Sequence, residues 1–259
     1  MAGVSTKKDN SASPGHPESA TSTAMAARAD RDLRVPCFCE ENVWRLAYRK
    51  LYLKAEPAQS RAKSLNSNDV QPQAGYNSSY YVIFVSNKNK CVCFYHQLAN
   101  SDPLSPVFWD YHVLLIEQRH TSKNDEIQST TLVWDMDSHL PYPCPLEYYV
   151  EASFRSIADY QEMGSNDRKI YLTQLERVSP CFRVIPAEKF LENFSSDRSH
   201  MWDAIKKKWS ATPPTYDPIM PDGIKHSNLS IYIDMISRQD DAVYGSVLSQ
   251  EQFGRRFLQ

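Results

Sequence analysis

Glycine is scarce in this sequence, with 7 residues in a chain of 259. Loops that cradle phosphate groups and dinucleotide-binding fingerprints need closely spaced glycines, and no two glycines here stand in such a pattern. Long apolar runs are also missing, since no stretch approaches the roughly 20 residues that a membrane-spanning helix requires. We therefore expect no cofactor and no membrane partner.

The chain lacks a net excess of either charge. Its 29 basic and 31 acidic residues give a formal net charge of −2. Nucleic-acid-binding proteins usually show a basic excess, so we expect no nucleic-acid partner. The N-terminus has no apolar leader segment, and six cysteines without one indicate reduced thiols in the cytosol, and also in the nucleus. Without heptad repeats or a large charge, a monomer is expected.

Large apolar side chains are almost absent from residues 1–33, which are rich in Ser, Ala, Thr and charged residues. Such a segment cannot bury enough surface to offset its ordering entropy, and we predict a disordered tail. Residues 34–259 are expected to form a single domain. Within it, residues 55–78 are polar and predict a surface insertion.

The rest of the chain alternates between helical and extended patterns. Apolar residues at helical spacing follow Cys39 and predict a helix that begins there, with Glu40 and Glu41 in its first turn. Further helices are expected near residues 146–161, 187–194 and from 249 to the C-terminus. The last of these has capping-box spacing at Ser249 and Gln252.

Aromatic and β-branched runs predict the strands. Residues 80–86 and 91–96 flank a polar turn and predict a hairpin. Residues 107–117 predict one long buried strand, and 130–137 predict the next. Strands close together in sequence favour an α+β fold, in which helices pack on a central, mostly antiparallel sheet.

Cys39 is the first candidate for chemistry. A thiol at a helix N-terminus lies near unpaired N–H groups and the positive end of the helix dipole, which favours the thiolate. A cysteine nucleophile also needs a base and a group that orients the base. Among the histidines, His112 is the one embedded in a strongly apolar strand. A carboxylate beside it would resolve the cost of burying both groups.

Three carboxylates compete to orient His112. Asp110 shares a strand face with His112, while Asp135 and Asp137 share a face of the following strand. Periodicity does not choose among them. A zinc site is a further alternative, because paired thiols could supply four ligands, although one intervening residue is an unusual zinc spacing. These thiols are Cys37, Cys39, Cys91 and Cys93.

Several blocks of the sequence together resemble the protein N-terminal glutamine amidohydrolase family. The resemblance covers residues 35–259, and its blocks keep the order of the family. They are FCEENVW (38–44), VFWDYHV (107–113), WDMD (134–137) with LPYPC (140–144), NFSSDRSHM (193–201) and PPTY (213–216).

The resemblance implies a fold related to papain-like and transglutaminase-like thiol enzymes, with a triad of Cys39, His112 and Asp135 and no metal. It implies deamidation of N-terminal glutamine in protein or peptide substrates through a thioester. The N-terminal glutamate produced would feed the N-degron degradation pathway. Alternatives are a cysteine protease, a transglutaminase-type acyl transferase and a non-catalytic module that binds N-termini.

An enzyme of this kind must recognise a free α-ammonium group, so that internal glutamine is spared. A desolvated carboxylate is the natural partner of an ammonium group. We take Asp110, Asp137 and Asp197 as candidates for this contact, and Trp109 as a candidate for lining the cleft.

Overall fold

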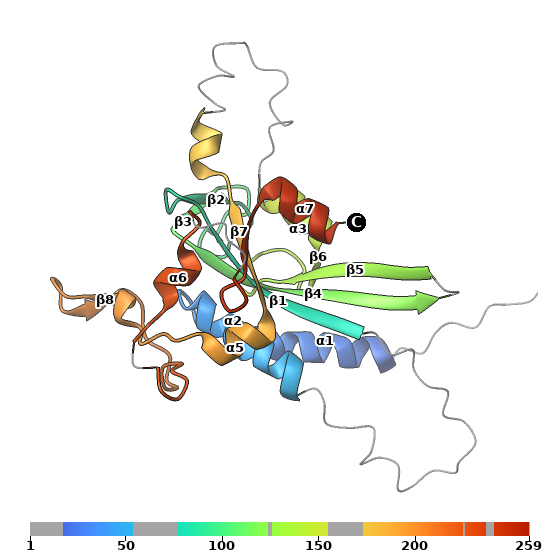
Figure 1. Ribbon diagram of the computed structural model, residues 1–259, viewed down its shortest axis with the longest axis horizontal. Helices are drawn as coiled ribbons and strands as arrows, with labels where there is room; N and C mark the ends of the chain where they lie inside the picture. The colour runs from blue at the N-terminus through green and yellow to red at the C-terminus, as the bar shows by residue number, and fades with distance from the viewer. Residues whose placement is uncertain are drawn as a thin grey trace, which may run out of the picture.

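The computed structural model describes residues 18–53, 77–123, 126–154, 173–224, 226–236 and 241–258. Its centre is a six-stranded sheet in the order β10-β7-β1-β4-β5-β6, in which each adjacent pair of strands is antiparallel (Figure 1). The strands are β1 (Asn77–Ser86), β4 (His112–Lys123), β5 (Glu126–Trp134), β6 (Cys144–Pro145), β7 (Cys181–Pro186) and β10 (Ser246–Ser249).

Helices cover both faces of this sheet (Figure 1). The described helices are α1 (Glu18–Arg31), α2 (Cys39–Tyr48), α3 (Leu146–Ser153), α5 (Ala187–Asn193), α6 (Leu229–Ile233) and α7 (Gln250–Phe257); α2 continues into a π-helical turn, Arg49–Leu53, and residues 173–178 are also helical. Two small antiparallel pairs lie outside the sheet: β2 (Val92–Phe94) with β3 (Val107–Trp109), and β8 (Trp202–Asp203) with β9 (Lys208–Trp209).

The core is divided by the sheet into two halves. Successive side chains of a strand point to opposite faces, so Val82 and Phe84 of β1 pack with α2 and α5. Ile83 and Val85 of the same strand pack on the other side, with α3 and α7. The predicted α+β fold with a mostly antiparallel sheet is confirmed.

Strand pairing differs from the prediction in two places. Residues 80–86 and 91–96 do not form a hairpin, because β1 pairs with β4 and β7 while β2 pairs with β3. Both edges of β1 are therefore occupied by strands distant in sequence. The predicted strand 107–117 is interrupted, since the exposed Asp110 accepts a hydrogen bond from the Tyr111 N–H and separates β3 from β4.

Of residues 1–33, for which a disordered tail is predicted, residues 18–31 form α1 and residues 1–17 lie outside the described residues. Contacts with the core hold this helix, because the buried Asp30 carboxylate lies 2.6 Å from the Lys50 ammonium. The predicted insertion at 55–78 also lies outside the described residues, except that residues 77–78 belong to β1. The capping box at Ser249 is confirmed.

Candidate active site

Cys39 is the first residue of α2, where it follows Phe38. The first hydrogen bond of the helix runs from the Asn42 N–H to the Phe38 carbonyl, so the N–H groups before Asn42 lie at an open helix end. Cys39 shares a cavity of about 290 Å³ with His112. The cavity is lined by Cys37, Cys39, Trp109, Asp110, Tyr111, His112, Asp137, His200, Met201, Leu229 and Ile233.

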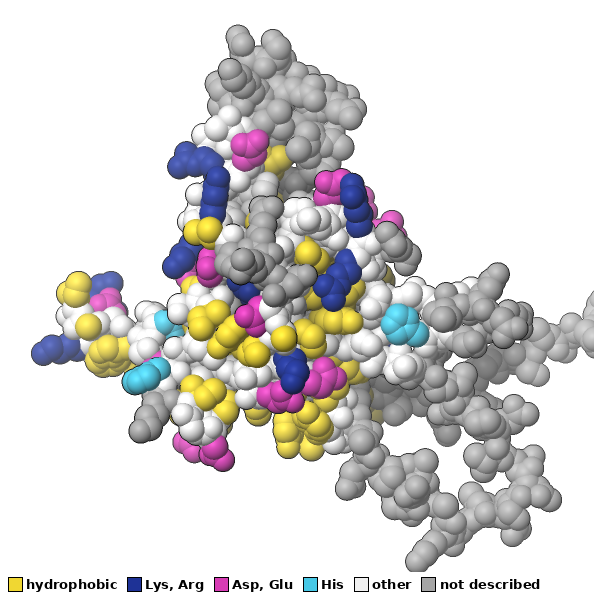
Figure 2. Space-filling view, in the orientation of Figure 1, with side chains coloured by type: hydrophobic (Ala, Val, Ile, Leu, Met, Phe, Trp, Pro, Cys, Tyr) yellow, Lys and Arg dark blue, Asp and Glu magenta, His cyan; other side chains and the backbone are white. Residues whose placement is uncertain are grey.

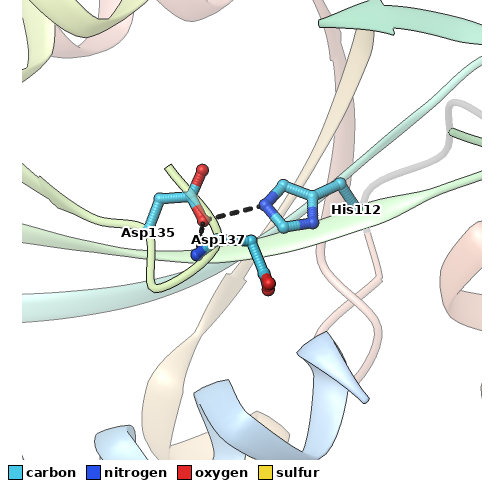
Figure 3. A group of neighbouring side chains, drawn as sticks. All are labelled: His112, Asp135 and Asp137. Carbon is cyan, nitrogen blue, oxygen red and sulfur yellow. Dashed lines mark hydrogen bonds and ion pairs between the residues drawn. The ribbon is translucent and has the colours of Figure 1, made fainter. Parts of the chain in front are cut away.

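His112 is the first residue of β4 and only 2% of it is exposed. Its Nε2 lies 2.9 Å from Oδ1 of Asp135, which directly follows β5 (Figure 3). The Trp109 ring stacks on the imidazole with centroids 6.0 Å apart, and the Phe94 ring meets it edge-on at 5.4 Å. The ring is therefore oriented by one hydrogen bond and two aromatic contacts, and its Nδ1 is left for a second proton acceptor or donor.

Asp135 accepts hydrogen bonds on both carboxylate oxygens. Besides His112, the donors are the Tyr149 hydroxyl at 2.6 Å, the Gln97 amide at 3.3 Å and the Asp137 N–H at 2.9 Å. Burial alone would raise the pKa of this carboxyl group, but the His112 charge and these donors outweigh it and lower the pKa to about 2. Asp135 is therefore an ionised partner for the imidazole, and protein donors bind both of its carboxylate oxygens.

The pKa of His112 moves in the opposite direction. Burial lowers it, but the charge and hydrogen bond of Asp135 outweigh burial, and the net pKa is raised above the ordinary value. Asp135 therefore stabilises the imidazolium that forms when His112 takes a proton from a nucleophile.

The Cys39 thiol has a pKa well above its ordinary range. The largest cause is burial, followed by the charges of Glu40 and Asp137, while the Val113 N–H acts against them. The Glu40 carboxylate lies 3.6 Å from the sulfur. The helix end alone therefore does not favour the thiolate in this site, because burial and neighbouring carboxylates outweigh the helix dipole.

A second polar cluster, which the sequence did not reveal, lies beside the thiol. Tyr111 donates a hydrogen bond to Glu40 at 3.2 Å, and Nε2 of His200 lies 3.4 Å from the other carboxylate oxygen. Glu40 and Glu41 are both fully buried, and Glu41 accepts hydrogen bonds from Nε and Nη2 of Arg198, each at 2.8 Å. Adjacent glutamates thus have different environments, which spacing on a helix cannot predict.

Of the four residues predicted to contact substrate, three line the cavity and one does not. Trp109, Asp110 and Asp137 line the cavity. Asp197 does not line it, and its carboxylate instead accepts a hydrogen bond from the Ser199 N–H at 2.9 Å. Asp137 binds Arg34 at 2.7 Å, and its pKa is raised, chiefly by burial.

Three side chains of this site could in principle hold a metal ion. Within the part of the chain that the structure describes, one group of three possible metal ligands occurs, namely His112, Asp135 and Asp137, whose ligand atoms lie within 4.8 Å of one another (Figure 3). Asp135 already accepts four hydrogen bonds there, which a metal would have to displace. The four-cysteine zinc alternative is not formed among these residues.

An α+β protein with a helix-terminal cysteine and a histidine on one cavity, the histidine bound to a buried aspartate behind it, has the arrangement of thiol-dependent hydrolases. Within that class, a family model described as N-terminal glutamine amidase matches residues 34–257. The chain therefore belongs to the N-terminal glutamine amidase family.

Relatives from plants and animals agree with this family. The chain is 34% identical over 241 residues to the protein N-terminal glutamine amidohydrolase of Arabidopsis thaliana, which covers 89% of this chain and 90% of the relative. It is 33% identical over 243 residues to the protein of the same name from Bos taurus, covering 93% and 95%. It is 33% identical over 221 residues to the protein of that name from Homo sapiens, and the match covers 85% of each chain. Among the described residues, no helix is long and apolar enough to cross a membrane.

Proposed function

We propose that this chain hydrolyses the side-chain amide of an N-terminal glutamine in proteins, giving N-terminal glutamate and ammonia. Family membership over residues 34–257 supports the reaction. The observation that carries the residue roles is that the buried His112, whose imidazole lies 2.9 Å from Asp135, lines the same cavity as Cys39. Cys39 is the nucleophile, His112 the general base and acid, and Asp135 the group that orients the imidazole.

The first half of the reaction forms a thioester. Because the thiol is neutral at rest, His112 removes its proton as the sulfur attacks the amide carbon of the substrate side chain. The N–H groups at the start of α2 stabilise the oxyanion of the tetrahedral intermediate. His112 then protonates the departing nitrogen, the carbon–nitrogen bond breaks and ammonia leaves.

The second half restores the enzyme. His112 accepts a proton from water, whose oxygen attacks the thioester carbon. The carbon–sulfur bond breaks, glutamate is released and Cys39 regains its proton from the imidazolium. Asp135 stabilises that imidazolium in both halves. The glutamate product is then available to the N-degron pathway.

Specificity for the chain terminus is proposed to come from carboxylates of the cavity. Asp110 and Asp137 line it and can accept hydrogen bonds from the α-ammonium group, while Trp109 forms an apolar wall. Asp197 is left out of this proposal because its carboxylate caps the Ser199 N–H. We further propose that residues 34–259 act as one catalytic domain and as a monomer.

The test is ammonia release from peptides. The wild-type protein is expected to release ammonia from a peptide that begins with glutamine, but not from its N-acetylated form or from one with internal glutamine. Cys39→Ala should abolish release, and Cys91→Ser serves as the control because Cys91 lies off the cavity.

Three other results would contradict the proposal. Cleavage of the peptide backbone would indicate a protease, and incorporation of an added amine would indicate an acyl transferase. Tight binding of the peptide without turnover by the wild-type protein would indicate a non-catalytic module.

A further inference from the structure

The β8–β9 hairpin, residues 202–209, projects from the body of the molecule (Figure 1). Isolated two-stranded hairpins are marginally stable in water. This one is supported by the rings of Trp202 and Trp209, which pack edge to face with centroids 5.4 Å apart. At its tip, the Asp203 carboxylate accepts hydrogen bonds from the N–H groups of Ile205 and Lys206. The hairpin therefore has a defined conformation.

The surface of the hairpin combines exposed apolar and basic side chains (Figure 2). Ile205 is 94% exposed, and Trp202 and Trp209 are 42% and 38% exposed. Lysines occupy positions 206–208, and Lys206 forms an ion pair with Asp203 at 3.2 Å, so the hairpin carries a positive excess although the chain as a whole has a net charge of −2. Apolar residues gathered at the end of a projecting element, with cations beside them, are typical of an interaction surface.

The hairpin is continuous with the cavity. Met201, the residue before β8, lines the cavity together with His200. Each arm from Met201 to the tip spans about four residues, or roughly 13 Å at about 3.3 Å per residue. An N-terminal residue held in the cavity leaves the rest of its polypeptide at the rim. An extended substrate that follows the hairpin would therefore place roughly its third to sixth residues against the lysines.

We propose that the β8–β9 hairpin binds the polypeptide that follows the N-terminal glutamine and favours acidic residues at about positions 3–6 of the substrate. The inference rests on the proposed function and extends it to substrate choice. Carboxylates of the cavity, Asp110 and Asp137, attract the α-ammonium group, while the lysines outside attract carboxylates further along the chain. A substrate with a positive end followed by negative side chains matches this order of charges.

The experiment compares ten-residue peptides that begin with glutamine and carry either glutamate or serine at positions 3–6. The wild-type protein is expected to show kcat/KM about tenfold higher for the glutamate peptide, because several exposed ion pairs each contribute modestly. The difference should lie in KM, since these contacts are equal in the ground and transition states. It should shrink at about 0.5 M salt, where charges at the surface are screened.

The variant K206Q/K207Q/K208Q should lower the ratio of the two kcat/KM values towards one. The matched control is K88Q/K189Q/R255Q, which removes the same charge from exposed positions off the cavity and should keep the wild-type ratio.

A wild-type ratio near one, or an unchanged ratio in the hairpin variant, overturns the inference while leaving ammonia release intact. Loss of binding to RNA or anionic vesicles by the hairpin variant, with an unchanged peptide ratio, overturns it as well. No ammonia from either peptide would instead contradict the proposed function.

Discussion

At the scale of single residues, the site is dominated by the contrast between two neighbouring glutamates. The Arg198 guanidinium binds Glu41 through two hydrogen bonds, so the charge of Glu41 is compensated. Glu40 has one carboxylate oxygen without a hydrogen bond and lies 3.6 Å from the Cys39 sulfur. Its charge therefore opposes formation of the thiolate, which is why the proposed mechanism has His112 take the thiol proton during attack.

The first prediction concerns this opposition. Glu40→Gln keeps the size of the side chain but removes its charge, so the pKa of the Cys39 thiol should fall. Alkylation of Cys39 by iodoacetamide at pH 8 should then become roughly tenfold faster, and its pH profile should move to lower pH. The measurement is peptide mapping of Cys39 by mass spectrometry across a pH series.

Glu188→Gln is the matched control, because it makes the same substitution at an exposed position of α5. Its alkylation profile should follow that of the wild-type protein. Identical profiles for Glu40→Gln and the wild-type protein would show that Glu40 does not set the reactivity of the thiol.

Spacing singled out His112 but left three carboxylates open as its partner, and the family resemblance chose Asp135 among them. The structure places the His112 imidazole 2.9 Å from the Asp135 carboxylate. The Gln97 amide and the Tyr149 hydroxyl, which also bind Asp135, come from segments 38 and 14 residues away. Neither has a spacing that singles it out, because such partners depend on how distant segments pack.

At the scale of elements, α1 is part of the packed structure. Its Asp30 carboxylate is 1% exposed and lies 2.6 Å from the Lys50 ammonium, which is 0% exposed. Arg34, just after the helix, binds Asp137, and the Arg31 guanidinium donates to the Ser138 carbonyl. The N-terminal segment thus contacts the same turn that carries Asp135.

The second prediction tests this docking. Asp30→Ala removes the carboxylate beside a buried ammonium and should lower the free energy of unfolding by about 3–5 kcal/mol, measured by urea denaturation. The double variant Asp30→Ala with Lys50→Met replaces both charges by apolar groups and should recover most of the loss.

Asp32→Ala is the control, since it removes a carboxylate two residues away, at an exposed position. It should change the free energy of unfolding by less than about 0.5 kcal/mol. If Asp30→Ala were as mild as this control, α1 would not be held by the buried pair.

Elements themselves were easier to predict than their pairing. Periodicity located α2, α5 and α7, because each depends on local spacing and caps. Periodicity did not predict which strands pair with β1, whose partner residues are 112–120 and 181–186. Burial of both faces of a strand removes the alternation that would otherwise specify a neighbour.

At the scale of the whole molecule, the active site is built at some cost in stability. The Asp137 carboxyl group has a raised pKa in the folded protein, chiefly because it is buried, even with Arg34 at 2.7 Å. A raised folded pKa means that the folded state binds the proton more tightly than the unfolded state. Deprotonation near neutral pH therefore favours unfolding, and the cost disappears as pH falls through the folded pKa.

The last prediction follows from that sign. Asp137→Asn should raise the free energy of unfolding at pH 7 by about 0.5–1 kcal/mol, with a smaller gain at pH 4, because no charge has to be buried. The same change should lower kcat/KM for a glutamine peptide about tenfold or more, since Asp137 is a proposed partner of the α-ammonium group. Asp110→Asn is the control on the same cavity: its exposed carboxylate carries no burial cost, so activity should fall without a gain in stability. Urea denaturation at the two pH values, beside the ammonia assay, separates these outcomes. A loss of stability at pH 7 in Asp137→Asn would contradict the view that this carboxylate is kept for substrate binding at the expense of the fold.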